Sequence, residues 1–327
     1  MKSIWREIIL SLIMGMILPG IVLNWAVEVP EPEPEETVPR SVPGTQPQLR
    51  QPEPVQICLR DSSGGVQTMG LEEYLVGVVL SEMPAAFHPE AKKAQSVAAR
   101  TFAAKAAATG GKHGDGSVCA DPGCCQAYIS PEAYLNRGGT EKAVEQARQA
   151  VEATSGYVLM YEGSLIEATY FSCSGGYTED AVAVWGTEVA YLRSTPSPGE
   201  ENAVHYSDTV QFTRRELEQK LGISLPEDSG NWVKDITYTA GGGVDKLSIG
   251  GISFRGTEVR KMLGLRSTAF TLTVRDGNLR FETRGFGHRV GMSQYGAEAM
   301  AEKGSTYQQI LAHYYRGTSL ELTNAAG

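Results

Sequence analysis

The sequence lacks an excess of positive charge: 29 Lys and Arg stand against 38 Asp and Glu, for a formal net charge of −9. A general nucleic-acid binder needs basic patches that neutralise backbone phosphates, so this balance argues against a nucleic-acid partner. The acidic residues gather near the start of the chain, so the net charge says little about any site. The sequence also has no internal repeat, and its 327 residues, 41% of them hydrophobic, suffice for a folded core.

Charged residues are absent from Ile8 to Val27. An uncharged run of this length can span a bilayer as a helix, even with a proline and an asparagine in it. Lys2 and Arg6 precede the run and acidic residues follow it, which places the N-terminus in the cytoplasm. A cleaved signal peptide is the alternative, but the run is long for a signal peptide and no clear A-x-A cleavage site follows. We therefore predict that residues 1–27 form a retained single-pass membrane anchor.

Large apolar residues are nearly absent from residues 28–54, which are rich in Pro and Glu. Such a segment cannot bury enough surface to fold, and its prolines keep it extended, so we predict a disordered linker. Residues 55–327 then form one large extracytoplasmic domain of helices and short strands, in the α+β class. We expect an edge hairpin near its start and three helices later in the chain. These elements are a hairpin over 55–66 and helices over 212–221 with Thr213 as N-cap, 292–303 with Ser293 as N-cap, and 307–315.

The stretch from Leu71 to Ala108 contains two helical patterns broken by a proline-marked turn. Pro84 disfavours helical geometry at Met83, so Glu82 falls in the last turn of the first helix. An apolar face and the negative end of the helix dipole both disfavour an ionised side chain, so we expect a raised pKa suited to a general acid. The alternative is a carboxylate that reaches water from the helix end. The apolar face consists of Leu71, Leu75 and Val78, which Glu82 continues.

The second helix opens with Pro89 and Glu90, residues favoured in a first turn. Its small residues spread around the circumference, as in a helix buried between layers. Arg100 lies on one of these faces, where a guanidinium must find a carboxylate or a polar ligand. Two interpretations stay open: an ion pair that fixes the helix, or a contact with substrate.

A cysteine-rich loop follows this second helix. His113, Cys119, Cys124 and Cys125 fall within one short segment rich in Gly, Asp and Pro. Four soft ligands on such a loop suit a closed tetrahedral zinc site. A disulfide is the competing interpretation, because thiols can oxidise in a domain that faces outward. A bridge from Cys119 would leave one cysteine and His113 without a role.

The first stretch also carries a resemblance. Glu82 and Arg100 lie in the segments EEYLVGVVLSEMP and EAKKAQSVAARTFA, which resemble the core signature of the stage II sporulation protein D family. That family comprises membrane-anchored lytic transglycosylases of spore-forming bacteria that act on peptidoglycan during engulfment. The resemblance implies that Glu82 is the catalytic acid and that Arg100 is a position linked to activity.

The resemblance extends to the cysteine loop. Relatives carry zinc there, held by a His, a Cys and a consecutive pair followed by Gln, and CCQAY matches that pattern. The sequence departs at Cys124, where a relative has His. Both residue types bind zinc, so the resemblance implies a structural Zn²⁺ ion with no ligand position left for water.

Two glycine-rich segments continue the resemblance, YFSCSGGYTEDAVAVWG and GFGHRVGMSQYG. They depart from the family at Cys173, where Ser, Thr or Asn is usual, and at Arg289, where Gly is usual. We interpret Cys173 as a packed thiol. For His288, a contact with sugar, an orienting role toward Glu82 and a structural hydrogen bond all stay open. The substrate-binding candidates are Arg100, Ser174, Gly175, His288, Gln294 and Tyr295.

The predicted reaction uses one acid/base residue. Glu82 would protonate the glycosidic oxygen between N-acetylmuramic acid (MurNAc) and N-acetylglucosamine (GlcNAc). As carboxylate it would then accept the proton of the muramic C6 hydroxyl, which attacks C1 and closes a 1,6-anhydro ring. Ordinary glycosidases need two carboxylates, and no second one stands out in the motifs.

The resemblance also implies a setting and partners. The domain would act on glycan strands between the mother-cell and forespore membranes, in septal remodelling and engulfment. Its partners would be an amidase or endopeptidase and membrane proteins of the engulfment complex. The alternative function is a non-catalytic glycan-binding enhancer of a cell-wall amidase, because the superfamily includes such proteins. A zinc hydrolase would need an open metal position, which four protein ligands do not leave.

Overall fold

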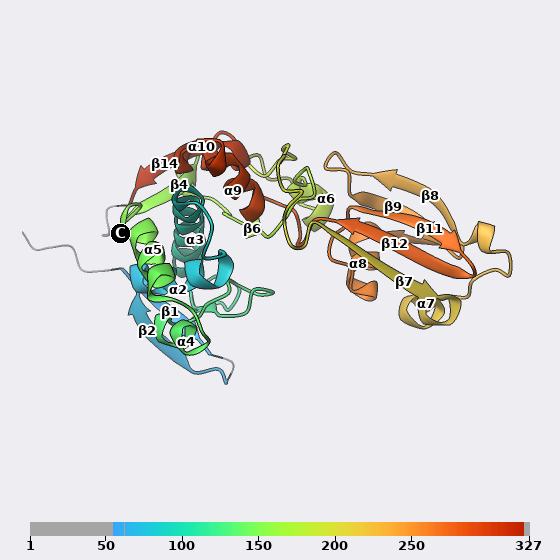
Figure 1. Cartoon of the computed structure of the whole chain (residues 1–327), viewed down its shortest axis with the longest axis horizontal. Helices are drawn as coiled ribbons and strands as arrows, with labels where there is room; N and C mark the ends of the chain where they lie inside the picture. The colour runs from blue at the N-terminus through green and yellow to red at the C-terminus, as the bar shows by residue number, and fades with distance from the viewer. Residues whose placement is uncertain (1–54, 62, 324–327) are drawn as a thin grey trace, which may run out of the picture. The chain divides into compact units, whose positions relative to one another are not determined.

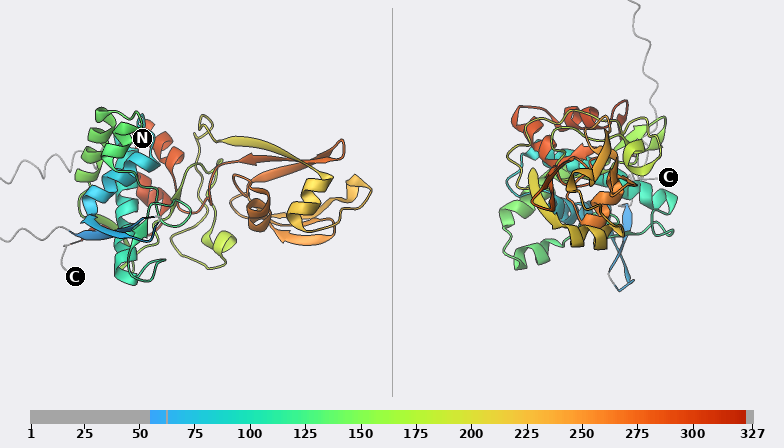
Figure 2. Two further views of the ribbon diagram at one scale, coloured as in Figure 1. Left: turned by 90° about the horizontal axis from the view of Figure 1, so that it is seen from below. Right: turned by 90° about the vertical axis from the view of Figure 1, so that its right-hand side faces the viewer.

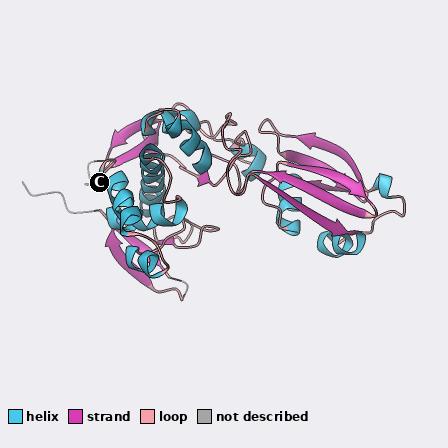
Figure 3. Cartoon of the chain, viewed as in Figure 1, coloured by secondary structure: helices cyan, strands magenta, loops and turns pink. Residues whose placement is uncertain are grey.

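A computed structural model describes residues 55–61 and 63–323 (Figure 1). The predicted anchor and linker lie outside these residues, so they stay predictions. Within the described ranges, no helix combines the length and apolar character that a membrane crossing requires. The described residues belong to one compact unit that contains two hydrophobic cores. Helices and mostly antiparallel strands are mixed in it, consistent with the predicted α+β class (Figure 3).

The first core is mainly helical and is built around one long helix, α3. Alanines such as Ala91, Ala94 and Ala98 are fully buried on α3, so its backbone approaches its neighbours closely. The C-terminal helices α9 and α10, drawn in red, lie beside α3, which is drawn in blue-green (Figures 1 and 2). The helices of this part are α2 (Leu71–Glu82), α3 (Pro89–Thr109), α4 (Pro131–Asn136), α5 (Glu141–Glu152), α6 (Ala181–Trp185), α9 (Gln294–Glu302) and α10 (Tyr307–Tyr314).

Three small sheets border these helices, in the strand orders β2-β1-β3, β14-β4-β5 and β13-β6. The predicted hairpin is confirmed as β1 and β2, but β1 is central because it also pairs with β3 in parallel. The β13–β6 pair is parallel and joins segments far apart in the chain. The strands are β1 (Gln56–Arg60), β2 (Val66–Gly70), β3 (Val118–Cys119), β4 (Tyr157–Tyr161), β5 (Ser164–Leu165), β6 (Tyr170–Phe171), β13 (Met292–Ser293) and β14 (Ser319–Leu322).

The second core is built from two antiparallel three-stranded sheets, ordered β10-β9-β8 and β11-β12-β7, with two helices. The predicted cap is confirmed: Thr213 and Glu216 form a capping box, and Gly222 ends the helix in a left-handed conformation. The elements are β7 (Ser207–Thr213), α7 (Arg214–Leu221), β8 (Val233–Tyr238), β9 (Val244–Ile249), β10 (Ile252–Arg255), α8 (Gly256–Leu263), β11 (Phe270–Arg275) and β12 (Asn278–Arg284).

The two other predicted helices are also confirmed. Ser293 caps α9, its side chain accepting a hydrogen bond from the Gly296 N–H. Helix α10 begins after Thr306, which forms a second capping box with Gln309. Local capping signals therefore fixed these boundaries to within a residue or two.

Candidate active site

Glu82 is the last residue of α2, as Pro84 predicted. The next residue, Met83, has left helical geometry, with φ −115° and ψ 127°. The helix differs from prediction in its burial, because apolar residues are buried on most of its sides and not along one stripe. Most of α2 is therefore packed inside the protein, and the side chain of Glu82 at its end is half-buried.

The Glu82 carboxyl group is held by one donor on each oxygen. The Ala127 N–H donates to Oε1 at 2.8 Å, and Gln294 Nε2 donates to Oε2 at 3.0 Å. Burial raises the pKa of Glu82, and the hydrogen bonds from Gln294 and Ala127 offset part of that rise. The direction agrees with the prediction for a general acid.

Two tyrosines that the sequence analysis missed lie near this carboxyl group. Tyr74 is fully buried, and the hydroxyl group of the partly buried Tyr170 also lies out of solvent. Burial together with the nearby charge of Glu82 raises the pKa of both phenols. Both hydroxyls are therefore protonated at neutral pH. The Tyr74 ring stacks on Tyr128 at 5.4 Å. A signal for Tyr74 was available, because it lies two helical turns before Glu82 on the same helix.

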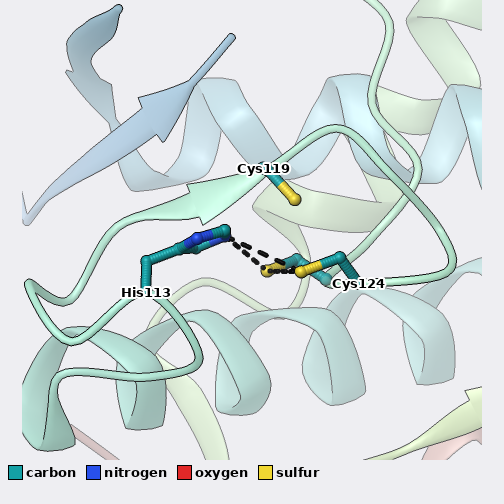
Figure 4. Close-up of side chains that lie close together, drawn as sticks. His113, Cys119 and Cys124 are labelled. Atoms are coloured by element: carbon teal, nitrogen blue, oxygen red, sulfur yellow. Dashed lines mark hydrogen bonds between the residues drawn. The ribbon is translucent and has the colours of Figure 1, made fainter. Parts of the chain in front are cut away.

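The four predicted metal ligands come together after α3 (Figure 4). Their ligand atoms all lie within 4.8 Å of one another. Cys125 Sγ lies 3.5 Å and Cys124 Sγ 3.8 Å from His113 Nε2, and the two sulfurs are 3.9 Å apart. A tetrahedral zinc site with ordinary bond lengths has edges of about 3.6 Å between S and N and about 3.8 Å between S and S. The set of one His and three Cys therefore fits a zinc ion, with Cys119 as the fourth ligand.

The cysteine loop and Glu82 are joined through the backbone. Ala127, which donates to Glu82, follows Cys125 by two residues. Gln126 between them is buried, and its Nε2 donates to the Ala99 carbonyl of α3 at 3.2 Å. The donor to Glu82 is therefore only two residues from the cysteine pair along the chain. No sequence signal marked Ala127, because its contribution is a backbone group.

Gln294 and Tyr295 were predicted to bind substrate. The structure gives Gln294 a positioning role, since its side-chain amide donates to Glu82. The Tyr295 ring packs edge-on against Phe87 at 5.0 Å, and its N–H donates to the Ser172 carbonyl. The start of α9 is therefore held to Glu82, to the loop between α2 and α3 and to the residue after β6.

Ser174 and Gly175 are bound by a carboxylate that sequence reasoning missed. Glu200 Oε2 accepts from the Ser174 N–H at 2.7 Å, from Ser174 Oγ at 2.8 Å and from the Gly175 N–H at 3.0 Å. The Ser174 side chain is fully buried, so the prediction that it contacts substrate is replaced by a structural role. Cys173 is also buried beside Glu200, and burial raises the pKa of its thiol, as for a packed thiol.

His288 contacts two aromatic rings, neither of which is stacked parallel to it. Its Nδ1 accepts from the Val290 N–H at 3.1 Å, and its ring lies 5.6 Å from Phe171 and 5.5 Å from Trp185. Burial, with the nearby charge of Arg260, lowers the pKa of His288 to about 4, so the ring is neutral at neutral pH. The structural hydrogen bond considered for His288 is confirmed.

Arg100 forms an ion pair, which was one of the two interpretations left open for it. Its side chain is 1% exposed, and it donates from Nε and Nη2 to the two carboxylate oxygens of Glu72 at 2.8 and 2.6 Å. Further bonds reach the carbonyls of Val151 and Tyr157. Arg100 therefore ties α2, α3, α5 and β4 together, which corrects its assignment as a substrate-binding residue.

Arg289 occupies a backbone conformation that favours glycine, with φ 66°. Its guanidinium donates to the carbonyls of Ser174, Tyr177 and Gly241 and to Glu179 Oε1, at 2.7 to 3.0 Å. These bonds offset a backbone strain of about 1–2 kcal/mol. The departure from the family's glycine therefore keeps the backbone conformation and adds a buried clamp between the two cores.

The chain is similar to proteins of one known family. A family model for the stage II sporulation protein matches residues 60–161, which include Glu82, Arg100 and the cysteine loop. Stage II sporulation protein D of Bacillus amyloliquefaciens is 40% identical over 287 residues, 86% of this chain and 83% of the relative. The Bacillus subtilis protein of the same name is 40% identical over 278 residues, 83% of this chain and 80% of the relative.

The chain therefore belongs to the stage II sporulation protein D family, a family of sporulation proteins. It is also similar to a protein named amidase enhancer from Bacillus subtilis. That protein is 32% identical over 305 residues, and the match covers 75% of this chain and 40% of the relative.

Proposed function

We propose that this protein is a peptidoglycan lytic transglycosylase that cleaves the MurNAc–GlcNAc bond with Glu82 as its single acid/base residue. The observation that carries the proposal is the Glu82 carboxyl group, whose pKa is raised by burial and whose two oxygens are oriented by Ala127 and Gln294. A general acid works best when its pKa lies close to the operating pH.

The two donors suit both halves of the reaction. Glu82 first gives its proton to the glycosidic oxygen, and the bond to C1 breaks. The carboxylate left behind is stabilised by the N–H of Ala127 and the amide of Gln294. It then takes the proton from the muramic C6 hydroxyl as that oxygen bonds to C1, which leaves a 1,6-anhydro end and restores the acid. No water is consumed, and no second carboxylate is required.

We further propose that His113, Cys119, Cys124 and Cys125 hold one zinc ion. Four protein ligands complete a tetrahedral shell, so the ion would be structural and would not activate water. Its role would be to fix the backbone that leads from Cys125 to Ala127, and so the donor to Glu82.

The cellular setting is part of the proposal. Residues 1–27 would anchor the protein in a membrane, and the catalytic domain would act on septal glycan strands between the mother-cell and forespore membranes. An amidase or endopeptidase and membrane proteins of the engulfment complex would be its partners. Membership of a sporulation protein family supports this setting.

Mass spectrometry of digested glycan strands tests the reaction, because the anhydro end is its signature. The wild-type protein should release 1,6-anhydroMurNAc ends, and Glu82→Gln should not. Glu73→Gln is the matched control, since Glu73 is exposed on the same helix and should leave product formation unchanged. Anhydro release by Glu82→Gln at the wild-type rate would show that the mechanism is wrong.

A second candidate function is a non-catalytic enhancer of a cell-wall amidase. The similarity to the amidase enhancer favours it, although this chain spans 40% of that protein. The two functions separate in one assay with glycan strands and a purified amidase. If wild type and Glu82→Gln both leave the strands uncleaved but stimulate the amidase equally, the enhancer function replaces the transglycosylase.

A further inference from the structure

Trp185 is an exposed aromatic residue beside the glycine-rich loop that carries His288. It ends α6 and is 45% exposed, whereas the other described tryptophan, Trp232, is 2% exposed. Its ring lies 5.5 Å from the His288 ring at an interplanar angle of 49°. A large aromatic ring that contacts a second ring and is still partly exposed is a feature of ligand-binding surfaces.

The support beneath Trp185 is rigid. His288 is fixed by the Val290 N–H on Nδ1 and by the edge of Phe171, a buried residue of β6. The low pKa of His288 makes this a contact between neutral rings near neutral pH. Helix α6 is held in turn by Arg255, which donates to the Ala183 carbonyl at 2.9 Å. The exposed ring is thus preorganised, and a ligand would lose little conformational entropy in using it.

The same support leads to Glu82. Strand β6 consists of Tyr170 and Phe171, and Tyr170 is near enough to Glu82 for the carboxylate to raise the pKa of its phenol. β6 pairs with β13, which runs directly into Gln294, the donor to Glu82. The β6–β13 pair therefore links Gln294, the donor to Glu82, with Phe171, which contacts the His288 ring beside Trp185.

We propose that the exposed part of the Trp185 ring is a stacking platform for one N-acetylhexosamine ring of a glycan strand whose scissile bond lies at Glu82. A pyranose with equatorial substituents presents an apolar face of C–H groups and a polar rim. A flat indole matches that face while leaving the hydroxyl and acetamido groups free for hydrogen bonds. This inference rests on the proposed function for its ligand class, and it adds a subsite to that function.

The test measures binding without turnover. The full chain in detergent, carrying Glu82→Gln, is titrated calorimetrically with the N-acetylglucosamine tetramer. Adding Trp185→Ala should weaken binding about three- to tenfold, and Trp185→Phe should retain most of the affinity. Trp185→Leu, which keeps apolar bulk but loses the flat ring, should behave like Trp185→Ala. Tyr238→Ala is the matched control, since Tyr238 is a 57% exposed aromatic residue on β8 of the second core.

Three outcomes decide the matter, given unchanged thermal unfolding midpoints of the variants. Equal affinity of Trp185→Ala and its parent overturns the platform. Equal affinity of Trp185→Leu and Trp185→Phe shows that bulk and not stacking matters, which also overturns it. If the tetramer binds through Trp185 but wild-type protein forms no anhydro ends, the platform stands and the transglycosylase proposal fails.

Discussion

Glu82 and Glu200 are two carboxylates in or near the family segments. They differ in the number of hydrogen bonds that they accept. Glu200 is 1% exposed, and its oxygens accept from Ser174 Oγ, from the N–H groups of Ser174 and Gly175, and from Ser197 Oγ. Glu82 has one donor on each oxygen and is half-buried. A carboxylate offers about four acceptor positions, so Glu200 is saturated while Glu82 keeps room for substrate.

This comparison separates a structural carboxylate from the carboxylate that we propose as the acid/base residue. Saturation by hydrogen bonds holds Glu200 in place and makes the Ser-Gly-Gly turn rigid. Partial saturation with burial leaves Glu82 able to gain and lose a proton. The number of donors, and not proximity to a motif, thus distinguishes the two.

The largest expected effect is on the rate of glycan cleavage. Glu82→Gln should reduce the rate by about 10²–10⁴-fold, because the transferable proton is lost. The substitution should not lower the thermal unfolding midpoint, since the Gln294 amide can rotate and hydrogen-bond with the new amide. Rates are followed by anhydro-end formation and stability by calorimetry. If Glu82→Gln is inactive only because it is unfolded, Glu82 would be a structural residue like Glu200.

The next largest effect concerns the proposed zinc site. Purified protein should contain about one zinc per chain, and Cys125→Ser should lower zinc content, the unfolding midpoint and activity together. Elemental analysis and thermal unfolding provide the readouts, with Cys58→Ser as control because Cys58 lies outside the cluster. Metal-free protein with a Cys119 disulfide and full activity would exclude the site.

Glu200→Gln should chiefly reduce stability. The side-chain NH₂ group of the new glutamine would face at least one of the N–H groups that now donate to Glu200. Two donors cannot bond to each other, so a buried hydrogen bond to a charged carboxylate is lost. The free energy of unfolding should fall by about 2–3 kcal/mol, measured by urea titration. Cleavage by the folded fraction should remain well above that of Glu82→Gln. A stable Glu200→Gln protein without activity would assign Glu200 a direct role instead.

The smallest expected effect is on the pH dependence of stability. The folded-state pKa of Glu82 is raised, so its contribution to stability is fully present below the unfolded pKa and is lost as pH rises through the folded value. Glu82→Gln removes this loss, so the variant should gain stability relative to wild type as pH increases from about 4 to 7. Unfolding midpoints across this range test the sign. The unfolding midpoint of Glu82→Gln minus that of wild type should increase over this range, and a decrease would contradict the raised pKa.

Local signals explain what could be predicted about the fold. Pro84 ends α2 at Glu82 because a proline restricts the residue before it, and Thr213 and Ser293 cap their helices through neighbours three residues away. The clustering of His113 and the three cysteines was predictable because they share one short loop. Such features depend on residues close together in the chain, which a sequence displays directly.

By itself, therefore, the sequence placed Glu82 at a helix end and His113 and three cysteines in one short loop. Only the tertiary structure decided what each group touches. The donors to Glu82 come from positions 45 and 212 residues away, and the Arg100 partner, Glu72, lies 28 residues away on another helix. Those pairings depend on packing of whole elements, so the sequence left two roles open for Arg100 and gave no sign of the Ala127 N–H.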